Sequence, residues 1–332
     1  MASLLAIPGL LTEMGVDPRR VIAEAGLDPA LFDDPENTIP FTDLGRFVEL
    51  CVARTGCPYL GLRVGETMSP EVLGLVGKLA SCASDVGSAL RNIVKYLHLH
   101  DRGALPALWV NGDRATLAYV IHEPDVLATE QIYDAALAHA HNILKVLAGP
   151  RWKASEVCLS RPRPAQIEPY QHFFRTRLRF DADHNAVVFS ASWLNCPIDG
   201  ADAPSHRALM QLIEALDAPD AGDLVAQLRQ ALRKLLVGDV DEGKISLEEV
   251  SQQFAIHRRT LNRRLRAQGT SFKNLLDEAR YDIARQRLRD THLPVLKIAV
   301  TLGYADATAF TRAFRRWSGT SPAVWRSAHQ RF

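Results

Sequence analysis

Basic and uncharged polar side chains recur at helical spacing in two segments near the end of the 332-residue chain. Residues at positions i, i+3, i+4 and i+7 lie on one face of an α-helix. In the first segment this spacing is shared by Arg259, Asn262, Arg263 and Arg266. In the second segment it is shared by Thr308, Thr311, Arg312 and Arg315. Guanidinium groups packed this densely repel one another unless a polyanion neutralises them, so both faces favour contact with nucleic acid.

These side chains carry the hydrogen-bonding groups that recognise base edges in the major groove of DNA. Arg263 and Arg312 suit the paired acceptors of guanine, and Asn262 suits adenine, with about 1–3 kcal/mol of discrimination for each pair. Further arginines flank the two faces and are expected to contact phosphates, which positions a protein on DNA without specifying sequence. They are Arg258, Arg264, Arg266, Arg315 and Arg316.

Local signals predict a helix, a short turn and a second helix around the first basic face. Ser246 and Glu249 form a capping-box pattern that starts the first helix. A tight turn at 255–256 leads into the segment that carries the basic face, where Leu261 and Leu265 point towards a core. This order is the helix-turn-helix layout, whose second helix enters the major groove.

The second basic face has the same kind of support. Pro294 is expected at the first position of a helix, and Gly303 is expected to supply the left-handed turn after it. Asp306 then caps a helix over 307–317. The buried stripe of that helix is predicted to be Phe310, Phe314 and Trp317. One helix over Phe272–Arg289, about 27 Å long, is predicted to space the two motifs.

Charge is divided unevenly along the chain. Lys and Arg number 39 against 38 Asp and Glu, and the net charge of +1, taken whole, argues against nucleic acid. From Lys244 to Phe332, however, 17 basic and 7 acidic residues give +10, which leaves −9 on the remaining 243 residues. The segment 238–243 interrupts the apolar periodicity with acids and glycine. The sequence therefore predicts an effector-binding domain over 1–237, a linker over 238–243 and a DNA-binding domain over 244–332.

The first domain is predicted to be α+β, and the second to be all-α. Asn111-Gly112 is a hairpin signal between strands at 105–110 and 115–121. Thr42 is a plausible N-cap for a helix over Ile39–Arg54, and Ser84 and Asp85 start another helix. Further helices are expected over 129–147, 167–174, 205–216 and 223–237, and further strands over 157–160 and 186–190.

A small-molecule site is expected between this hairpin and the helix over 129–147. The aromatic residues expected to line it are Trp109, Tyr119 and Tyr133. Core packing explains these three side chains equally well, so both interpretations stay open.

Residues of other chemical types do not form a catalytic pattern. The histidine pairs His98/His100 and His139/His141 are separated by two positions, which points helical side chains about 200° apart and leaves no ready chelate. We identify no catalytic motif, no metal site and no cofactor site. The five cysteines are expected to be buried free thiols.

A longer motif spans the second helix-turn-helix region. It reads I-A, G-Y, F-x-R-x-F, G-x-S-P and W-R, at Ile298, Ala299, Gly303, Tyr304, Phe310, Arg312, Phe314, Gly319, Ser321, Pro322, Trp325 and Arg326. With this motif, the chain from Ser246 onward resembles the AraC/XylS family of bacterial transcription regulators. The resemblance implies base contacts early on each recognition helix, at Arg259, Asn262 and Arg263 and at Ala307, Thr308, Thr311 and Arg312. Two positions depart from the family, which often has Gly at Ala255 and commonly has Ser at His257.

The upstream region resembles the effector domain of a subgroup that includes regulators of ornithine use and mycobacterial virulence-type regulators. The similar segments are AEAGLDP near the start, LG-x-V-x-x-L, and NAVVFSASWLNCPI over Asn185–Ile198. The resemblance to this subgroup, rather than to the cupin domain of the arabinose regulator, implies a small-molecule effector, a homodimer and RNA polymerase as a partner. The amphipathic pattern of Asp223–Val237 supports the homodimer. The resemblance also implies that the protein activates transcription rather than represses it.

The sequence thus predicts an effector-responsive, sequence-specific regulator that binds promoter DNA and is not an enzyme. One alternative is a metabolite-binding sensor or enzyme-like first domain with ancillary DNA binding. Another is a nucleoid-type DNA-binding protein without an effector. The chain has no run of about 18 apolar residues, and its first residues lack the basic region of a signal peptide. A cytoplasmic protein that associates with the nucleoid when bound is therefore expected.

Overall fold

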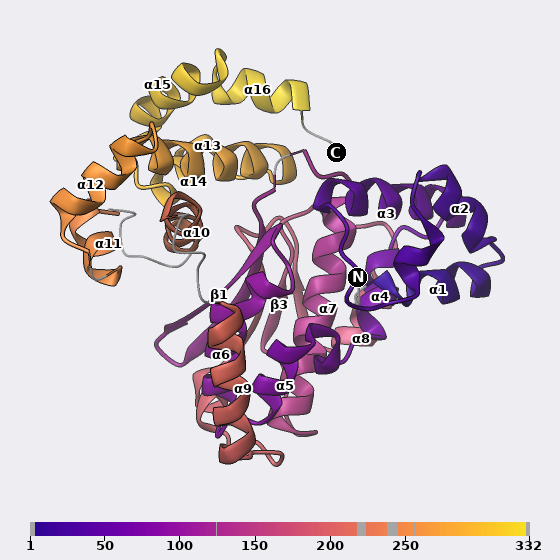
Figure 1. Ribbon diagram of the computed structural model, residues 1–332. Coiled ribbons are helices and arrows are strands. Elements are labelled where there is room, and N and C mark those ends of the chain that lie inside the picture. The colour runs from indigo at the N-terminus through magenta and orange to yellow at the C-terminus, as the bar shows by residue number, and fades with distance from the viewer. Residues whose placement is uncertain (1–3, 124, 218–223, 238–244, 255, 330–332) are drawn as a thin grey trace. The chain divides into compact units, whose positions relative to one another are not determined.

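A computed structural model describes residues 4–123, 125–217, 224–237, 245–254 and 256–329 of the chain (Figure 1). The chain divides into two compact units, Met1–Asp217 and Ala218–Phe332. The first unit is α+β, and the described part of the second unit is all-α. The predicted fold class is confirmed for both parts of the chain.

The first unit combines helices with one β-sheet. Its α-helices are α1 (Ile7–Glu13), α2 (Pro18–Glu24), α3 (Phe41–Thr55), α4 (Leu60–Glu66), α5 (Leu75–Ser81), α6 (Val86–Tyr96), α7 (Thr129–Ala148), α8 (Glu168–Phe174) and α9 (Ala203–Leu216). Short 3-10 helices are η2 (Pro29–Phe32), η3 (Pro70–Leu73), η4 (Leu97–Leu99) and η5 (Ala191–Asn195). The strands are β1 (Ala104–Asn111), β2 (Arg114–Ile121), β3 (Glu156–Cys158), β4 (Arg177–Arg179) and β5 (Asn185–Ser190).

The sheet has the strand order β1-β2-β5-β3-β4. β1 and β2 form the expected antiparallel hairpin, in which Asn111 pairs with Arg114. Gly112 has a φ of 60° at the turn, a conformation that Gly adopts without strain. The prediction missed β4, a three-residue strand that pairs in parallel with β3.

Two of the predicted helix starts in the first unit have different outcomes. Asp85 caps α6 as expected, because its side chain accepts a hydrogen bond from the Ser88 amide at 2.7 Å. The predicted cap at Thr42 is wrong. Pro40 occupies the N-cap of α3, and its extended ψ of 139° makes Phe41 the first helical residue, so Thr42 lies inside the first turn.

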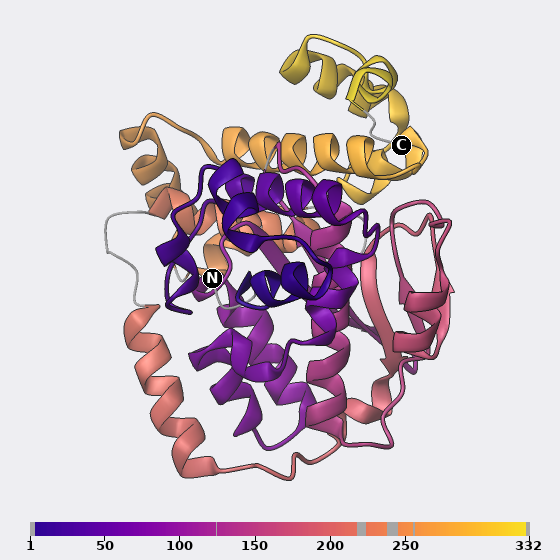
Figure 2. The ribbon, with the colours of Figure 1, turned by 90° about the vertical axis from the view of Figure 1, so that its right-hand side faces the viewer.

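Two glycines bring α4 and α7 into backbone contact. A methyl group at Gly61 would lie 2.0 Å from the carbonyl oxygen of Gln131, and one at Gly65 would lie 2.5 Å from that of Ala135. The Gln131 side chain joins the same pair of elements, because it accepts from the Gly61 amide and donates to the Pro58 carbonyl, both at 2.9 Å. Figure 2 shows α7 as a long helix within the first unit. At these two glycines, α4 and α7 therefore pack with their backbones in direct contact.

The second unit consists of helices in its described part. They are α10 (Leu224–Val237), α11 (Leu247–Gln253), α12 (Arg258–Ala267), α13 (Phe272–Asp290), α14 (Val295–Thr301), α15 (Ala307–Ser318) and α16 (Pro322–His329). The long helix α13 covers the predicted spacer and extends one residue beyond it.

Packing assigns α10 to the second unit, whereas the sequence places the boundary after Val237. Leu228 and Leu232 of α10 are fully buried, and α10 contacts α13. Ion pairs reinforce the contact, with Arg229 3.1 Å from Glu278 and Arg233 2.8 Å from Asp282. The two units therefore divide at Asp217 and Ala218, 20 residues before the expected end of the first domain. The apolar face of α10, on which the sequence support for a homodimer depends, packs against α13 of the same chain.

The local signals of the first helix-turn-helix motif form as predicted. The Ser246 hydroxyl accepts from the Glu249 amide at 3.2 Å, and the Glu249 carboxylate accepts from the Ser246 amide at 3.1 Å. His257 replaces the common Ser without loss of the cap, because its Nδ1 accepts from the Arg259 amide at 3.2 Å. Ala255 lies outside the described residues, so the expected turn at 255–256 is not described in full.

The second motif differs from its prediction at one residue. Asp306 caps α15 by accepting from the Ala309 amide at 2.7 Å, and Gly303 has the expected left-handed φ of 78°. Pro294 is the N-cap of α14 rather than its first helical residue, because its ψ of 141° is extended.

Candidate DNA-binding surface and ligand cavity

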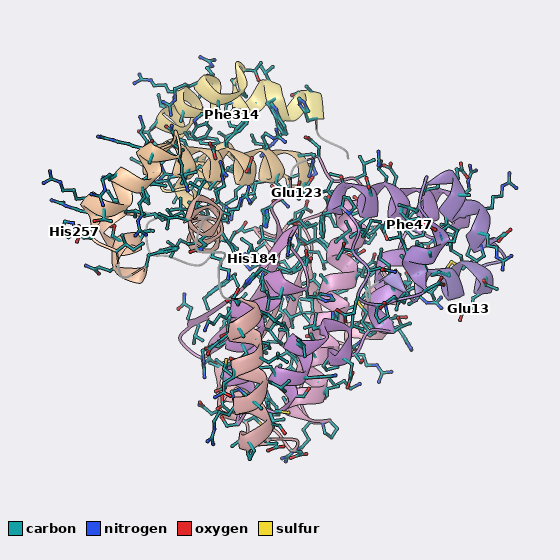
Figure 3. All side chains as sticks on the ribbon, viewed as in Figure 1. Glu13, Phe47, Glu123, His184, His257 and Phe314 are labelled. Atoms are coloured by element: carbon teal, nitrogen blue, oxygen red, sulfur yellow. The ribbon has the colours of Figure 1, made fainter. Side chains whose placement is uncertain are left out.

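The first recognition helix, α12, presents its basic face as the spacing predicts. Arg259, Arg263 and Arg266 are exposed and Asn262 is partly buried. Leu261 and Leu265 on the opposite side are fully buried and anchor the helix. Figure 3 shows His257 at the start of this helix, with side chains projecting from the unit around it. The helix therefore offers several cationic groups and one amide from a fixed backbone.

The second recognition helix, α15, has the same division between a core face and an outer face. Phe310 and Phe314 are fully buried, and Trp317 is partly buried, so the expected aromatic stripe is confirmed as core. On the outer face, Thr308 and Arg312 are exposed, whereas Ala307 and Thr311 are partly buried. The structure thus brings the four expected residues onto one short stretch of helix.

The arginines expected to contact phosphates fall into two groups. Within the described residues, Arg264, Arg266 and Arg315 are exposed and form no ion pair. Arg258 lies 3.8 Å from Glu248, and Arg316 lies 3.0 Å from Asp277. Both pairs include an exposed arginine, and such pairs contribute at most about 1 kcal/mol. The first group is free to meet a phosphate, while the second must exchange a carboxylate for it.

Arg326, to which the sequence assigns no role, stabilises the packing of the helices in the second unit. Arg326 of the W-R motif donates from Nε to the Leu288 carbonyl at 3.3 Å and also donates to the Leu293 carbonyl. It therefore joins α16 to the end of α13, where main-chain carbonyls lack helical partners. Arg289 of α13 is buried beside Asp290, at 2.7 Å.

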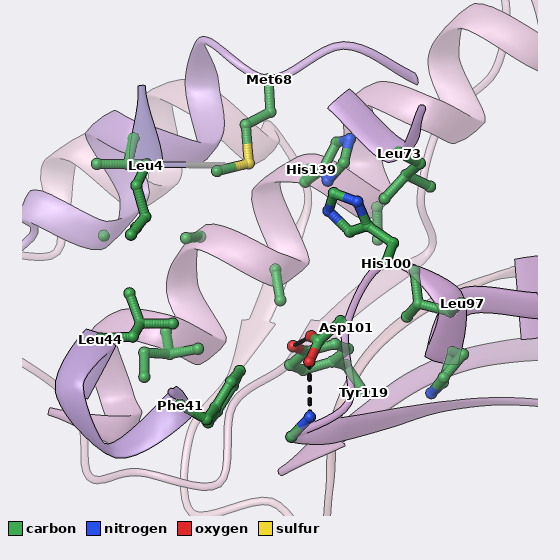
Figure 4. Close-up of a pocket in the computed structure, with 18 of the residues that line it drawn as sticks. Leu4, Phe41, Leu44, Met68, Leu73, Leu97, His100, Asp101, Tyr119 and His139 are labelled. Carbon is green, nitrogen blue, oxygen red and sulfur yellow. Dashed lines mark hydrogen bonds between the residues drawn. The ribbon is translucent and has the colours of Figure 1, made fainter. Parts of the chain in front are cut away.

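The first unit contains a cavity of about 780 Å³. Its walls come from the N-terminal helices, α4, α7 and the β1–β2 hairpin (Figure 4). Leu44, Leu73 and Leu97 are among the many aliphatic side chains that line it. The hairpin and α7 thus border a cavity, as the sequence led us to expect.

Of the three aromatic residues expected at this site, Tyr119 lines the cavity and the other two do not. Trp109 pairs with Thr116 across the hairpin, and side-chain alternation therefore places it on the sheet face opposite to Tyr119. There it packs edge-on against His184, with ring centroids 5.4 Å apart. Tyr133 is buried beside Tyr119, and its hydroxyl accepts from the Ile121 amide at 3.2 Å. Tyr133 therefore behaves as core.

Polar side chains gather on one side of this cavity, as Figure 4 shows for His100, Asp101, Tyr119 and His139. Asp101 accepts from the Gly103 amide at 2.9 Å and from the Tyr119 hydroxyl. Burial lowers the pKa of both His100 and His139 to about 4. Burial raises the pKa of Asp101, against the effect of its hydrogen bonds.

The two members of each histidine pair have different surroundings. His139 bonds through Nε2 to the Ser69 carbonyl at 2.8 Å, whereas His141 lies among aromatic rings, with its centroid 5.0 Å from that of Trp152. His98 contacts Asp217 at 2.6 Å, and His100 borders the cavity. In the described part of the chain, no three potential ligands cluster in a way that would hold a metal ion.

Together, the fold and the two recognition helices define a helix-turn-helix DNA-binding protein that carries an additional α+β unit. Residues 15–198 match the family described as the arabinose-binding domain of AraC transcription regulators, and residues 250–328 match a helix-turn-helix domain family. The first match covers more than half of the sequence. The chain therefore belongs to the AraC family of transcriptional regulators.

Individual relatives extend over nearly the whole chain. It is 27% identical to the transcriptional regulator VirS of Mycobacterium tuberculosis, over 96% of this chain and 93% of that protein. It is also 27% identical to the ornithine utilization regulator of Pseudomonas aeruginosa, over 97% and 94%. Among solved structures, the regulator CdpR of Pseudomonas aeruginosa covers 93% of this chain and 96% of its own, with 23% identity and a TM-score of 0.46. No described helix is both long and apolar enough to cross a membrane.

Proposed function

We propose that this protein is an effector-responsive activator that binds two adjacent major-groove segments of a promoter. The supporting observation is that α12 and α15 each hold exposed arginines over a fully buried apolar face. The 19-residue helix α13 connects the two motifs and is about 28 Å long at the usual rise. This length is close to the spacing of about 34 Å between successive major-groove faces on one side of DNA.

Base recognition is assigned to the outer faces of the two helices. In α12 the proposed base contacts are Arg259, Asn262 and Arg263; in α15 they are Ala307, Thr308, Thr311 and Arg312. Arginine offers two donors to guanine, asparagine pairs with adenine, and small or hydroxyl side chains contact the thymine methyl group. Arg258, Arg264, Arg266, Arg315 and Arg316 are assigned to phosphates.

The base assignment is tested by Arg312→Ala in the full chain, with promoter DNA and a set of single base-pair substitutions. We expect affinity for the promoter to fall and the preference at one position to relax by about 1–3 kcal/mol. Arg207→Ala in α9 is a matched control, because it removes an exposed arginine outside the recognition helices. If Arg312→Ala retained both affinity and preference in a gel-shift series, α15 would not be a recognition helix.

The phosphate assignment has a different signature, which is the salt dependence of binding. Arg315→Ala should weaken binding to all sequences alike and reduce the salt slope by about 0.9. Arg316→Ala should have a smaller effect, because Arg316 must first leave Asp277. An unchanged slope for Arg315→Ala would remove this residue from the phosphate contacts.

Regulation is proposed to require further partners. A small molecule in the cavity of the first unit is proposed to control binding, and RNA polymerase and a second copy of the chain are proposed to complete the active complex. This assembly would act in the cytoplasm, associated with the nucleoid. A promoter-reporter strain that carries cavity variants tests the first point. If reporter expression in these variants responds to the effector as it does in the wild type, the cavity does not control binding.

The alternative is a sensor or enzyme-like first unit to which DNA binding is ancillary. Mass spectrometry of ligand that co-purifies with the full chain distinguishes the two. Unaltered ligand, with promoter-specific footprints, supports the regulator. Steady turnover of the ligand supports the alternative.

A further inference from the structure

The cavity of the first unit is aliphatic along most of its wall, and this limits the ligand. Leucine, isoleucine and valine side chains from several helices line it, including Leu4, Val48, Leu60 and Ile143. A carbohydrate would bury many hydroxyl groups against such a wall, and each unpaired polar group would cost free energy. The wall instead favours a ligand with a long apolar part.

Asp101 places a carboxylate on this wall. The Gly103 amide occupies Oδ1 at 2.9 Å, and the Tyr119 hydroxyl donates to Oδ2. The Ala104 amide also stabilises the charged form of Asp101, and because a carboxylate has about four acceptor positions, these three donors leave acceptor capacity on the group. Within the described residues, no lysine, arginine or histidine side chain forms an ion pair with Asp101.

The neighbouring histidines supply little positive charge at neutral pH. Because burial lowers the pKa of His100 and His139 to about 4, both imidazoles are neutral at pH 7. Glu123, also on the wall, adds a second acid, while the cationic Arg102 lines the cavity but is exposed. The two acids beside neutral imidazoles therefore favour a cation over a carboxylate-bearing ligand.

We propose that the cavity binds a mainly aliphatic molecule with one protonated amine, and that the ammonium group pairs with the Asp101 carboxylate. The aliphatic part lies along the leucine-rich wall, and His100 and His139 provide neutral hydrogen-bonding groups beside the head. This inference specifies the effector class of the proposed regulator and rests on that proposal.

The test compares three probes of equal chain length, octylamine, 1-octanol and octanoate, by calorimetric titration of the full-length protein at pH 7.5. We expect octylamine to bind about tenfold more tightly than octanol, because a charge-assisted hydrogen bond is stronger than a neutral one. Octanoate should bind most weakly. This ranking needs no variant, and it is overturned if octanoate binds as tightly as octylamine or if the amine shows no advantage over the alcohol.

Variants then locate the charge. Asp101→Asn should remove the advantage of octylamine over octanol, whereas Glu123→Gln should preserve that advantage. If the advantage survives in Asp101→Asn, or disappears in Glu123→Gln instead, Asp101 is not the partner. Sequence-specific promoter binding by the wild type, measured in parallel, separates the two proposals. If the wild type showed no sequence-specific promoter binding, the proposed regulatory function would be wrong. If it bound the promoter but the probes did not follow the expected ranking, only the proposed ligand class would be wrong.

Discussion

The close contact between α4 and α7 makes a single methyl group a sharp test of how the cavity wall is built. In Gly61→Ala, the added carbon would lie 2.0 Å from the Gln131 carbonyl oxygen and 2.6 Å from its carbonyl carbon. These are backbone atoms, which cannot rotate away as a side chain would. The two helices must therefore move apart, and the Gln131 hydrogen bonds to the Gly61 amide and the Pro58 carbonyl must lengthen.

Three contributions set the expected change in the free energy of unfolding. Replacing Gly by Ala within a helix stabilises it by about 1 kcal/mol. Overpacking costs about 1–3 kcal/mol. Weakening the two Gln131 hydrogen bonds costs about 1 kcal/mol more. The net expectation for Gly61→Ala is a loss of about 2 kcal/mol.

Gly9→Ala is the matched control. Gly9 lies in α1, a seven-residue helix like α4, and a methyl group there would have no atom within 4 Å. This variant should gain up to about 1 kcal/mol. Urea denaturation followed by circular dichroism gives both values, and hydrogen exchange of peptides over 60–66 and 129–148 localises the loss. If Gly61→Ala were as stable as Gly9→Ala, the backbone contact would not limit the fold.

Three further changes test other parts of the structure. His141→Phe should reduce the loss of stability at acid pH. Burial lowers the pKa of His141 in the folded protein to about 4, so the free energy of unfolding of the wild type falls by up to about 3 kcal/mol as the pH falls from about 6.5 to 4. Phe does not titrate, so the variant lacks this contribution. An acid limb unchanged in urea titrations at several pH values would contradict this. Arg161→Met should cost about 3 kcal/mol, because it leaves Asp134 buried without its cation, 3.2 Å away in the native protein. Burial raises the pKa of Asp134 to about 6, so the loss should be smaller at pH 5 than at pH 8, and equal losses would refute the pairing. Ser246→Ala should cost about 1 kcal/mol by removing the capping box, seen as faster amide exchange in α11.

Short-range patterns predicted much of the local structure, because they depend on atoms a few residues apart. The Asn111-Gly112 turn, the Ser246–Glu249 capping box and the Asp306 cap each need one backbone conformation or one or two hydrogen bonds that the neighbouring sequence already supplies. The two incorrect helix starts, predicted at Thr42 and Pro294, also depend on residues that are close in sequence. In both cases a proline with extended ψ occupies the N-cap, so α3 begins before Thr42 and α14 begins one residue after Pro294.

The candidate site was predictable in one unit and not in the other. On α12 and α15 the outer faces follow from helical spacing, since the buried Leu261, Leu265, Phe310 and Phe314 determine which side is left for solvent. In the first unit, Trp109 and Tyr119 differ by strand register across the hairpin, which the aromatic content of the segment does not reveal. Asp101 and His139 meet at one cavity although they are far apart in sequence, and no local pattern connects them.

The sequence by itself determined the class of this protein, because charge, helical spacing and caps are properties of neighbouring residues. It predicted two helices with basic outer faces and the helix between them, and it shows a charge of +10 concentrated after Lys244. The tertiary structure alone decided that α10 packs with α13, which polar groups surround the cavity and which of the three aromatic residues lines it. Those outcomes depend on which apolar faces bury one another across long stretches of chain, and on the burial that then sets the charge of His100 and His139.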